Sequence, residues 1–490
     1  MLGAVFLAFA AYVLLLGLRR PFLWVLLYIY IDIIAPQRIA WGLIENLQIS
    51  LIAFLAAFGG YVVLDRKEAV GFSMRQGLLL ALLAYCFWTT GNAEFPEAAQ
   101  TKWDWVWKAL VFAIFLPFTL TTRARLEALA LTLVLSVGMI VIATGMKTVL
   151  GGGGYENLNF FVDDNSGIYE SSTLATVAIA LIPLIWWFTR YGTIFRPHWT
   201  VSAFAAGLIF ACLLIPIGTE ARTGLVCIAA LGVLMLRYTK RRALYLGGAA
   251  ALGLAALPFL PQSYYERMAT IAEPDGDESA STRVAVWKWT LEYVEDKPLG
   301  GGFDAFLGNS FTYRMPVRAE SGNTSVVEYV EVTDEARAFH SAFFEVLGEQ
   351  GWPGLTIWLA LHALGLWQME RIARRWRARE RAGFAKDRDA AGDPGDDEGW
   401  IAPMATALQL ASLVYLVGAT FQGIAYQPVM LMIIGLQIGL NSYCRRIESA
   451  RGRGVLQNRP ETRPGTRQER SGPAEPTSAK SAASSDTVTA

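Results

Sequence analysis

The chain alternates long apolar runs with short polar loops. A bilayer core of about 30 Å needs roughly 20 apolar residues in helical form. Measured against that length, the runs predict thirteen membrane-spanning helices, or twelve if the first two form one re-entrant pair. The predicted spans are 2–18, 21–36, 47–64, 75–90, 106–121, 126–147, 171–189, 199–218, 222–237, 243–260, 352–369, 401–421 and 424–443.

Arginine and lysine concentrate in the loops that follow the odd-numbered spans. Because cytoplasmic loops are enriched in these residues, we expect all of these loops on the cytoplasmic side. The N-terminus is then outside, and the span 2–18 lacks the basic leader and small-residue cleavage site of a signal peptide. The basic positions are Arg19, Arg20, Arg66, Lys67, Arg75, Arg123, Arg125, Arg190, Arg196, Arg237, Lys240, Arg241, Arg242 and the arginine run of 371–388.

This topology predicts an all-α polytopic membrane protein with one large periplasmic loop that contains amphipathic helices. Residues 1–260 hold ten spans, and 261–351 form the large loop. Residues 352–446 hold three spans and a charged cytoplasmic linker over 371–399. The tail, 447–490, is rich in Arg, Pro, Ser, Thr and Ala, so we expect it to be disordered in the cytoplasm.

Composition agrees with lipid as the solvent. Hydrophobic residues make up 54% of the chain and charged residues 17%, whereas soluble domains carry about a quarter charged residues. The formal net charge is zero, which gives no general attraction to nucleic acid. The four cysteines lie in or beside apolar runs, so we expect neither a zinc site nor a disulfide in the large loop.

Arg222 stands at the predicted outer end of a span, in the sequence Gly-Thr-Glu-Ala-Arg-Thr-Gly. The orientation rule disfavours an arginine on that side. A guanidinium at a helix N-terminus suits phosphate oxygens, because the planar fork and the unpaired backbone N–H groups both donate. The alternative is an interfacial anchor paired with Glu220.

Arg283 opens a helical pattern in the large loop. Val284, Trp287, Leu291 and Val294 recur at helical spacing and predict one apolar stripe. The helix is therefore predicted to lie on the outer leaflet, where Arg283 meets either substrate or lipid phosphates.

His340 precedes a second helical pattern that returns to the membrane. A neutral imidazole there can accept a proton from an attacking hydroxyl, and nearby arginines would keep it neutral. The alternative is a histidine satisfied by a backbone carbonyl. Gly300 and Gly302 are further candidates, because a glycine run permits close backbone approach to a ligand, with a plain turn as the alternative. The loop also contains Arg314, Arg318 and Arg337, which are either anion contacts or partners of neighbouring carboxylates.

A metal is the less favoured alternative. Asp275 and Asp277 have the D-x-D form that can hold a divalent cation. They lie in a strongly polar turn, so we predict no metal and no cofactor.

The order of these motifs resembles the O-antigen ligase and polymerase superfamily of bacterial envelope glycan enzymes. The resemblance rests on Arg222, on Arg283 with Trp287, on Pro298 to Phe306 with its glycines, and on His340 with Gly351 and Gly354. The opening Arg-Arg-Pro-Phe at 19–22, with Pro36-Gln37-Arg38 and Trp41-Gly42, is most similar to the O-glycosylation ligases associated with exosortase systems.

The resemblance implies a metal-independent glycosyltransferase of the bacterial inner membrane. A glycan would pass from a polyprenyl diphosphate carrier to an acceptor hydroxyl, on a protein or on another glycan, at the periplasmic face. Arg222 and Arg283 would bind the diphosphate, and His340 would act on the acceptor hydroxyl.

Two positions depart from the family pattern. Ser341 stands where members often have Asn, and Asp163-Asp164-Asn165 is followed by an unusual Ser-Gly-Ile-Tyr-Glu insertion. The competing interpretations of the whole chain are a polymerase of the same superfamily, a membrane transporter or flippase, and a scaffold protein. The acidic Asp32 and the basic His362 are the main ionisable residues within predicted spans, which is sparse for ion coupling.

Overall fold

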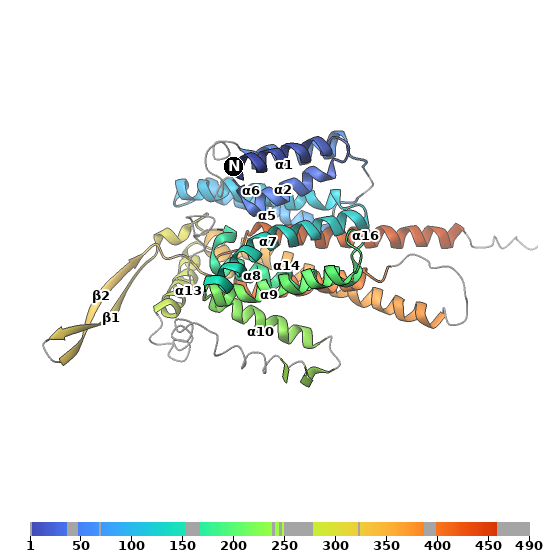
Figure 1. Cartoon of the computed structure of the whole chain (residues 1–490). Helices are drawn as coiled ribbons and strands as arrows, with labels where there is room; N and C mark the ends of the chain where they lie inside the picture. The colour runs from blue at the N-terminus through green and yellow to red at the C-terminus, as the bar shows by residue number, and fades with distance from the viewer. Residues whose placement is uncertain are drawn as a thin grey trace, which may run out of the picture. The chain divides into compact units, whose positions relative to one another are not determined.

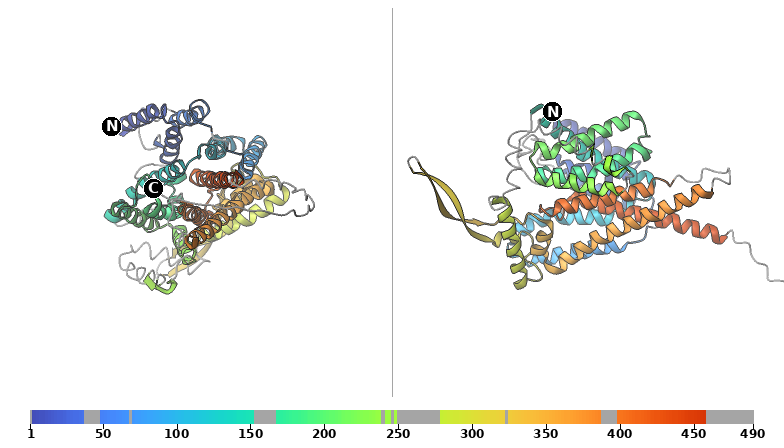
Figure 2. Two further views of the ribbon diagram at one scale, coloured as in Figure 1. Left: turned by 90° about the vertical axis from the view of Figure 1, so that its right-hand side faces the viewer. Right: turned by 90° about the horizontal axis from the view of Figure 1, so that it is seen from below.

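A computed structural model describes residues 2–36, 48–67, 70–151, 167–237, 241–244, 247–248, 278–321, 324–386 and 398–457. Residues 1–446 form one compact unit, and the second unit is 447–490, of which 447–457 are described and helical. Figures 1 and 2 show the helices of the first unit running side by side, with a β-hairpin beyond their ends.

The helices of the first half are α1 (Leu2–Gly17), α2 (Phe22–Ile34), α4 (Ile49–Val63), α5 (Met74–Gly91), α6 (Pro96–Thr119), α7 (Arg123–Gly151), the 3₁₀ turn η1 (Gly167–Tyr169), α8 (Ser171–Tyr191), α9 (Trp199–Gly218) and α10 (Arg222–Leu236).

The second half contains the large loop and the last helices. Its elements are α13 (Glu278–Asp296), the 3₁₀ turn η4 (Ala305–Gly308), β1 (Ser310–Ser321), β2 (Thr324–Glu335), α14 (Ala342–Lys386), α15 (Ile401–Ala419) and α16 (Pro428–Gln457). Gly351 has a non-helical backbone, so α14 consists of a short segment, 342–350, and a long one, 352–386.

The all-α polytopic fold predicted from the sequence is confirmed. Four described helices, α7, α8, α9 and α15, are long and apolar enough to cross a membrane, and α1, α2, α4 and α10 are shorter apolar helices. A helix overlaps every predicted span except 243–260, most of which lies outside the described residues.

Burial separates core helices from lipid-facing ones. On α8 nearly every side chain from Thr173 to Phe188 is buried, because α9, α10 and α15 pack around it. On α1 the large apolar residues Val5, Phe9 and Tyr12 are 46–67% exposed at helical spacing. An apolar stripe left outside the protein core is the expected solvent contact when the solvent is lipid.

The basic loops meet at one end of the bundle. There Arg125 of α7 binds Asp65 beyond α4 at 2.6 Å, Arg123 donates to Tyr191 O at 2.9 Å, and Arg237 binds Glu370 at 2.7 Å. The described residues of the large loop, 278–321 and 324–351, lie at the opposite end, which we call the site end. This end also contains the first residues of α8 and α10 and the α15–α16 loop, 420–427. The structure therefore separates the two kinds of loop as the arginine pattern requires, while the side of the membrane stays a prediction.

The large loop also contains an antiparallel hairpin that the sequence analysis did not predict. Strands β1 and β2 pair from Ser310 opposite Glu335 to Ser321 opposite Thr324. This register pairs Phe311 with Asp334, Tyr313 with Val332 and Met315 with Val330. The loop thus holds strands as well as the predicted helix.

Candidate functional site

Helix α13 packs against the start of α14 and so joins the two predicted motifs of the large loop. The indole Nε1 of Trp287 donates to Phe339 O at 2.9 Å, and the Trp287 ring stacks on Phe344 with centroids 5.0 Å apart. Arg283 lies one turn before Trp287, and His340 follows Phe339 directly. The packing therefore brings Arg283 and His340 into one site.

The predicted apolar stripe of α13 is wrong in detail. Val284 and Leu291 are 46% and 45% exposed, whereas Val286, Thr290 and Val294 are buried. The buried face is selected by protein packing on α14, where Thr290 lies close to Gly348. Spacing alone could not identify it, because Val284 and Val286 are equally apolar.

His340 lies at a strained junction. Its φ is +47°, a left-handed conformation that costs a non-glycine residue of order 1–3 kcal/mol and often marks functional sites. The side chain keeps an exposed surface, while its partial burial, followed by the charges of Arg283 and Arg337, lowers its pKa from the usual 6.5. The imidazole is therefore a neutral proton acceptor at pH 7.

Arg222 is the first residue of α10 and lies at the same end of the bundle. Glu220, two residues earlier, is buried with a φ of +52°. One turn into the helix, Cys227 contacts Thr176 of α8, and Thr176 accepts a 2.9 Å hydrogen bond from Gln422 in the α15–α16 loop. These contacts fix the N-terminus of α10 against the loop that also meets α14.

Glu170, between η1 and α8, is a carboxylate of this site that the sequence analysis did not select. It accepts from Thr173 Oγ1 at 2.7 Å. Burial raises its pKa, while the charge of Arg283 lowers it and that of Glu345 raises it. Glu170 thus lies within electrostatic reach of both the predicted diphosphate ligand Arg283 and the start of α14.

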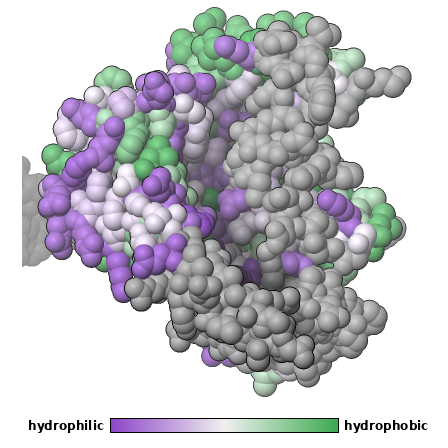
Figure 3. Space-filling view, turned by 90° about the vertical axis from the view of Figure 1, so that its left-hand side faces the viewer, coloured by the Kyte–Doolittle hydropathy of each residue, from purple (hydrophilic) through white to green (hydrophobic). Residues whose placement is uncertain are grey.

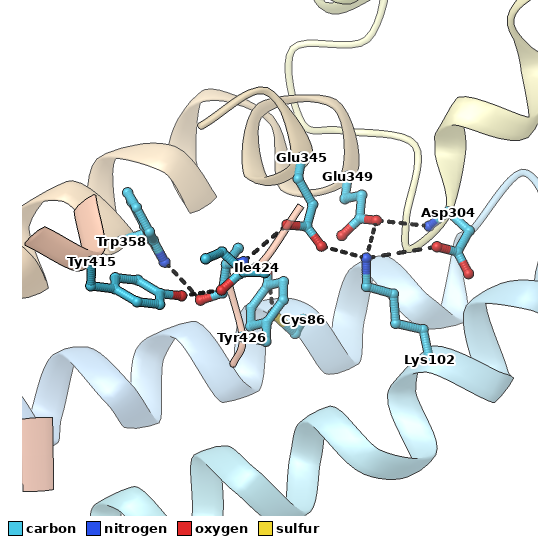
Figure 4. A network of polar contacts seen from close by, with 10 residues as sticks. Cys86, Lys102, Asp304, Glu345, Glu349, Trp358, Tyr415, Ile424 and Tyr426 are labelled. Atoms are coloured by element: carbon cyan, nitrogen blue, oxygen red, sulfur yellow. Dashed lines mark hydrogen bonds and ion pairs between the residues drawn. The ribbon is translucent and has the colours of Figure 1, made fainter. Parts of the chain in front are cut away.

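A buried ion cluster supports the start of α14 (Figure 4). Lys102 of α6 binds Glu345 at 2.7 Å, Glu349 at 2.6 Å and, more loosely, Asp304 at 3.6 Å. Sequence analysis missed these residues, although Glu345 and Glu349 are an acidic pair one turn apart on an otherwise apolar segment. We call Lys102, Asp304, Glu345 and Glu349 the lysine cluster.

Gly300 and Gly302 have φ values of +88° and +85° and lie against protein backbone. A Cβ on Gly300 would stand 2.4 Å from Glu349 O, and one on Gly302 would stand 2.4 Å from Ala93 Cβ. The glycine turn is also hydrogen-bonded to segment 342–350. Gly301 N donates to Gly348 O at 3.0 Å, and Gly302 N donates to Glu349 O at 2.9 Å. The close approach at Gly300 is therefore to the end of segment 342–350, and that at Gly302 is to Ala93, just after α5.

The arginines of the hairpin take different positions. Arg314 stands opposite Glu331 and Arg318 opposite Val327 in the strand register. Arg337, just beyond β2, forms an ion pair with Asp334 at 2.5 Å. The pairing of Arg337 with a neighbouring carboxylate agrees with the alternative that the acidic composition of the loop favours.

Metal ligands are not grouped in the part of the chain that the structure describes: no set of three His, Cys, Asp or Glu side chains there could hold an ion. Three carboxylates of the lysine cluster do converge, but the Lys102 ammonium occupies their centre. Asp275, Asp277 and Asp163 to Asn165 lie outside the described residues.

Ser341, which departs from the family pattern, is 1% exposed. Its Oγ makes no hydrogen bond within the described residues. Figure 3 looks onto the end with α13 and the hairpin, and the coloured wall beside the hollow at the centre of this view is lined mainly by hydrophilic side chains.

Comparison with known families divides the chain into two parts. Residues 207–359 match the model of the O-antigen ligase family, and residues 1–193 match a family of unknown function (DUF5935). No curated protein matches the chain. The ligase match contains Arg222, Arg283 and His340, and it supports glycosyl transfer of the ligase or polymerase type. The protein is thus a polytopic membrane protein in which residues 207–359 match the O-antigen ligase family.

Proposed function

We propose that the protein transfers a glycan from a polyprenyl diphosphate carrier to an acceptor hydroxyl, at the periplasmic face of the bacterial inner membrane. The observation that carries the proposal is that the Trp287–Phe339 hydrogen bond joins the helix of Arg283 to the backbone of His340, close enough for the charge of Arg283 to lower the His340 pKa, inside the region that matches the ligase family.

The chemistry requires charge neutralisation and a free nucleophile. The bond between the anomeric carbon and the diphosphate oxygen breaks, and the negative charge that develops on the diphosphate is stabilised by Arg222 and Arg283. His340 takes the proton of the acceptor hydroxyl as its oxygen bonds to the anomeric carbon. The products are the glycosylated acceptor and the free polyprenyl diphosphate.

The acceptor class separates ligase from polymerase. The resemblance to O-glycosylation ligases associated with exosortase systems favours a protein hydroxyl. In that case purified enzyme with donor alone forms no chain of linked repeats, and transfer requires added acceptor. A polymerase would lengthen the lipid-linked glycan without any other acceptor.

The test follows release of polyprenyl diphosphate from a lipid-linked glycan by purified protein, with an acceptor added and EDTA present. Arg222→Ala and Arg283→Ala should abolish release while the proteins remain inserted in the membrane. Arg374→Ala is a matched control, since Arg374 pairs with Glu370 at the opposite end of the bundle at 2.5 Å. Full activity in both site variants would refute the proposal, and loss of wild-type activity in EDTA would refute its metal-free form.

A further inference from the structure

Lys102 binds two carboxylates on one face of the segment that follows His340. Its Nζ lies 2.7 Å from Glu345 Oε1 and 2.6 Å from Glu349 Oε1, and these side chains stand one helical turn apart. The glutamate side chains are 6% and 0% exposed, and that of Lys102 is 13% exposed. The ammonium therefore holds both the first and second turns of segment 342–350.

The same two carboxylates fix two other parts of the chain. Glu345 Oε2 accepts from Ala425 N in the α15–α16 loop at 3.0 Å, and Glu349 Oε1 accepts from Asp304 N after the glycine turn at 3.0 Å. The α15–α16 loop is itself held from inside, since Trp358 Nε1 donates to Ala425 O at 3.1 Å and Tyr415 OH donates to Ile424 O (Figure 4). Segment 342–350 is therefore held by hydrogen bonds to the α15–α16 loop on one side and to Asp304 on the other.

The lysine cluster contains more carboxyl groups than cations. One ammonium faces the three carboxyl groups of Asp304, Glu345 and Glu349, and the buried Glu349 Oε2 makes no hydrogen bond within the described residues. Burial, followed by the charges of Glu345 and Asp304, raises the pKa of Glu349 against the opposing effect of Lys102. Removing Lys102 would leave these carboxyl groups buried without a counter-charge, and the loss of one partner of a buried ion pair is strongly destabilising.

We propose that Lys102 is a positioning residue for His340, acting through Glu345 and Glu349 on the segment that begins two residues after the histidine. This inference rests on the proposed function. Lys102 lies in the part of the chain that matches the family of unknown function, whereas both glutamates lie in the O-antigen ligase region. The N-terminal part of the chain thereby completes a site whose reacting groups belong to the other part.

The kinetic test compares Lys102→Met with wild type. A shift of about 1 Å in a reacting group can cost about 100-fold in rate, so kcat for glycan transfer should fall by up to about 100-fold with KM for the lipid-linked donor unchanged. Lys102→Arg keeps the cation and should retain more of kcat than Lys102→Met. The matched control is Arg125→Met, which removes the ion-pair partner of the buried Asp65 carboxylate at the opposite end of the bundle. This variant should lower Tm but leave kcat unchanged.

A second readout does not depend on activity. His340 modification by diethyl pyrocarbonate is measured in a His198→Gln background, where the only other histidine, His362, is buried. The rate should change in Lys102→Met and stay the same in Arg125→Met. A rise in donor KM with unchanged kcat would place Lys102 in donor binding and overturn the proposal, as would unchanged kcat and His340 reactivity at a lowered Tm. If wild type transfers no glycan, the proposed function fails, while the His340 reactivity still decides the positioning role.

Discussion

The indole Nε1 of Trp287 donates a 2.9 Å hydrogen bond to the carbonyl oxygen of Phe339, the residue directly before His340. Arg283 is one turn earlier on the same helix, so this single bond ties the helix that carries the proposed diphosphate ligand to the backbone that carries the proposed base. The left-handed backbone of His340 needs such support, because φ values above zero are uncommon for residues other than glycine.

Trp287→Phe should weaken transfer without unfolding the protein. The variant keeps an aromatic ring on Phe344 but loses the bond to Phe339 O, a loss of about 1 kcal/mol in stability. We expect kcat to fall by about tenfold or more as His340 shifts relative to Arg283. Trp289→Phe is the matched control on the same helix, where Trp289 stacks on Tyr293. Equal activity in the two variants would contradict the role of the Trp287 bond.

The pH profile should report a depressed His340 pKa. Neutral imidazole is the active form, and its pKa lies below 6.5, so the acid limb of kcat/KM should fall below pH 6.5. Arg337→Gln removes one of the charges that lower this pKa and should move the limb to higher pH. Arg374→Gln, at the opposite end of the bundle, should leave it in place. An acid limb above pH 6.5 in wild type would argue against this environment for the histidine.

Glu349 should make stability fall with rising pH. Its folded-state pKa is raised above the usual 4.5, so the stability it contributes is complete below pH 4.5 and is lost as pH rises through the folded value. The slope is at most about 1.4 kcal/mol per pH unit for one proton. Thermal unfolding in detergent should show Tm decreasing as pH rises from 4.5 through the folded-state pKa. Glu349→Gln should weaken this dependence of Tm on pH. An identical slope in the variant would show that the ionisation of Glu349 does not contribute.

Gly351→Ala should destabilise the junction between the two segments of α14. Its φ is +61°, and a Cβ would stand 2.2 Å from Pro298 O. Its ψ is −167°, and this combination is adopted almost only by glycine, so alanine there costs about 1–3 kcal/mol and the overlap adds to it. Gly308→Ala is the control, since its nearest neighbour would be Phe95 at an ordinary 3.5 Å. Comparable Tm values for the two variants would mean that the turn at 298–302 yields more readily than its hydrogen bonds indicate.

Sequence patterns predicted the helices well, because lipid as a solvent demands long apolar runs and the loops between them are short. The hairpin was missed even though its signals are present. Phe311, Tyr313, Met315 and Val317 alternate with polar residues, and Gly322-Asn323 separates two strands of equal length.

Part of the candidate site could be predicted from the sequence and part could not. Arg222, Arg283 and His340 could be selected because each is a charged or titratable residue in an unusual place. The lysine cluster could not, because Lys102 meets Glu345 across 243 residues and Glu349 across 247. Only the packing of α6 and α14 around α5 brings these residues to one end of the bundle.

Transfer by His340→Ala is the most direct measurement of the central claim. Purified wild type, His340→Ala and the control His198→Ala receive a polyprenyl diphosphate-linked glycan and an acceptor in EDTA. The His198 ring caps α9 at a distance from the site, so this control should transfer at the wild-type rate. We predict that transfer is lost only in His340→Ala. Transfer at the wild-type rate by His340→Ala would contradict the assignment of this residue as the base.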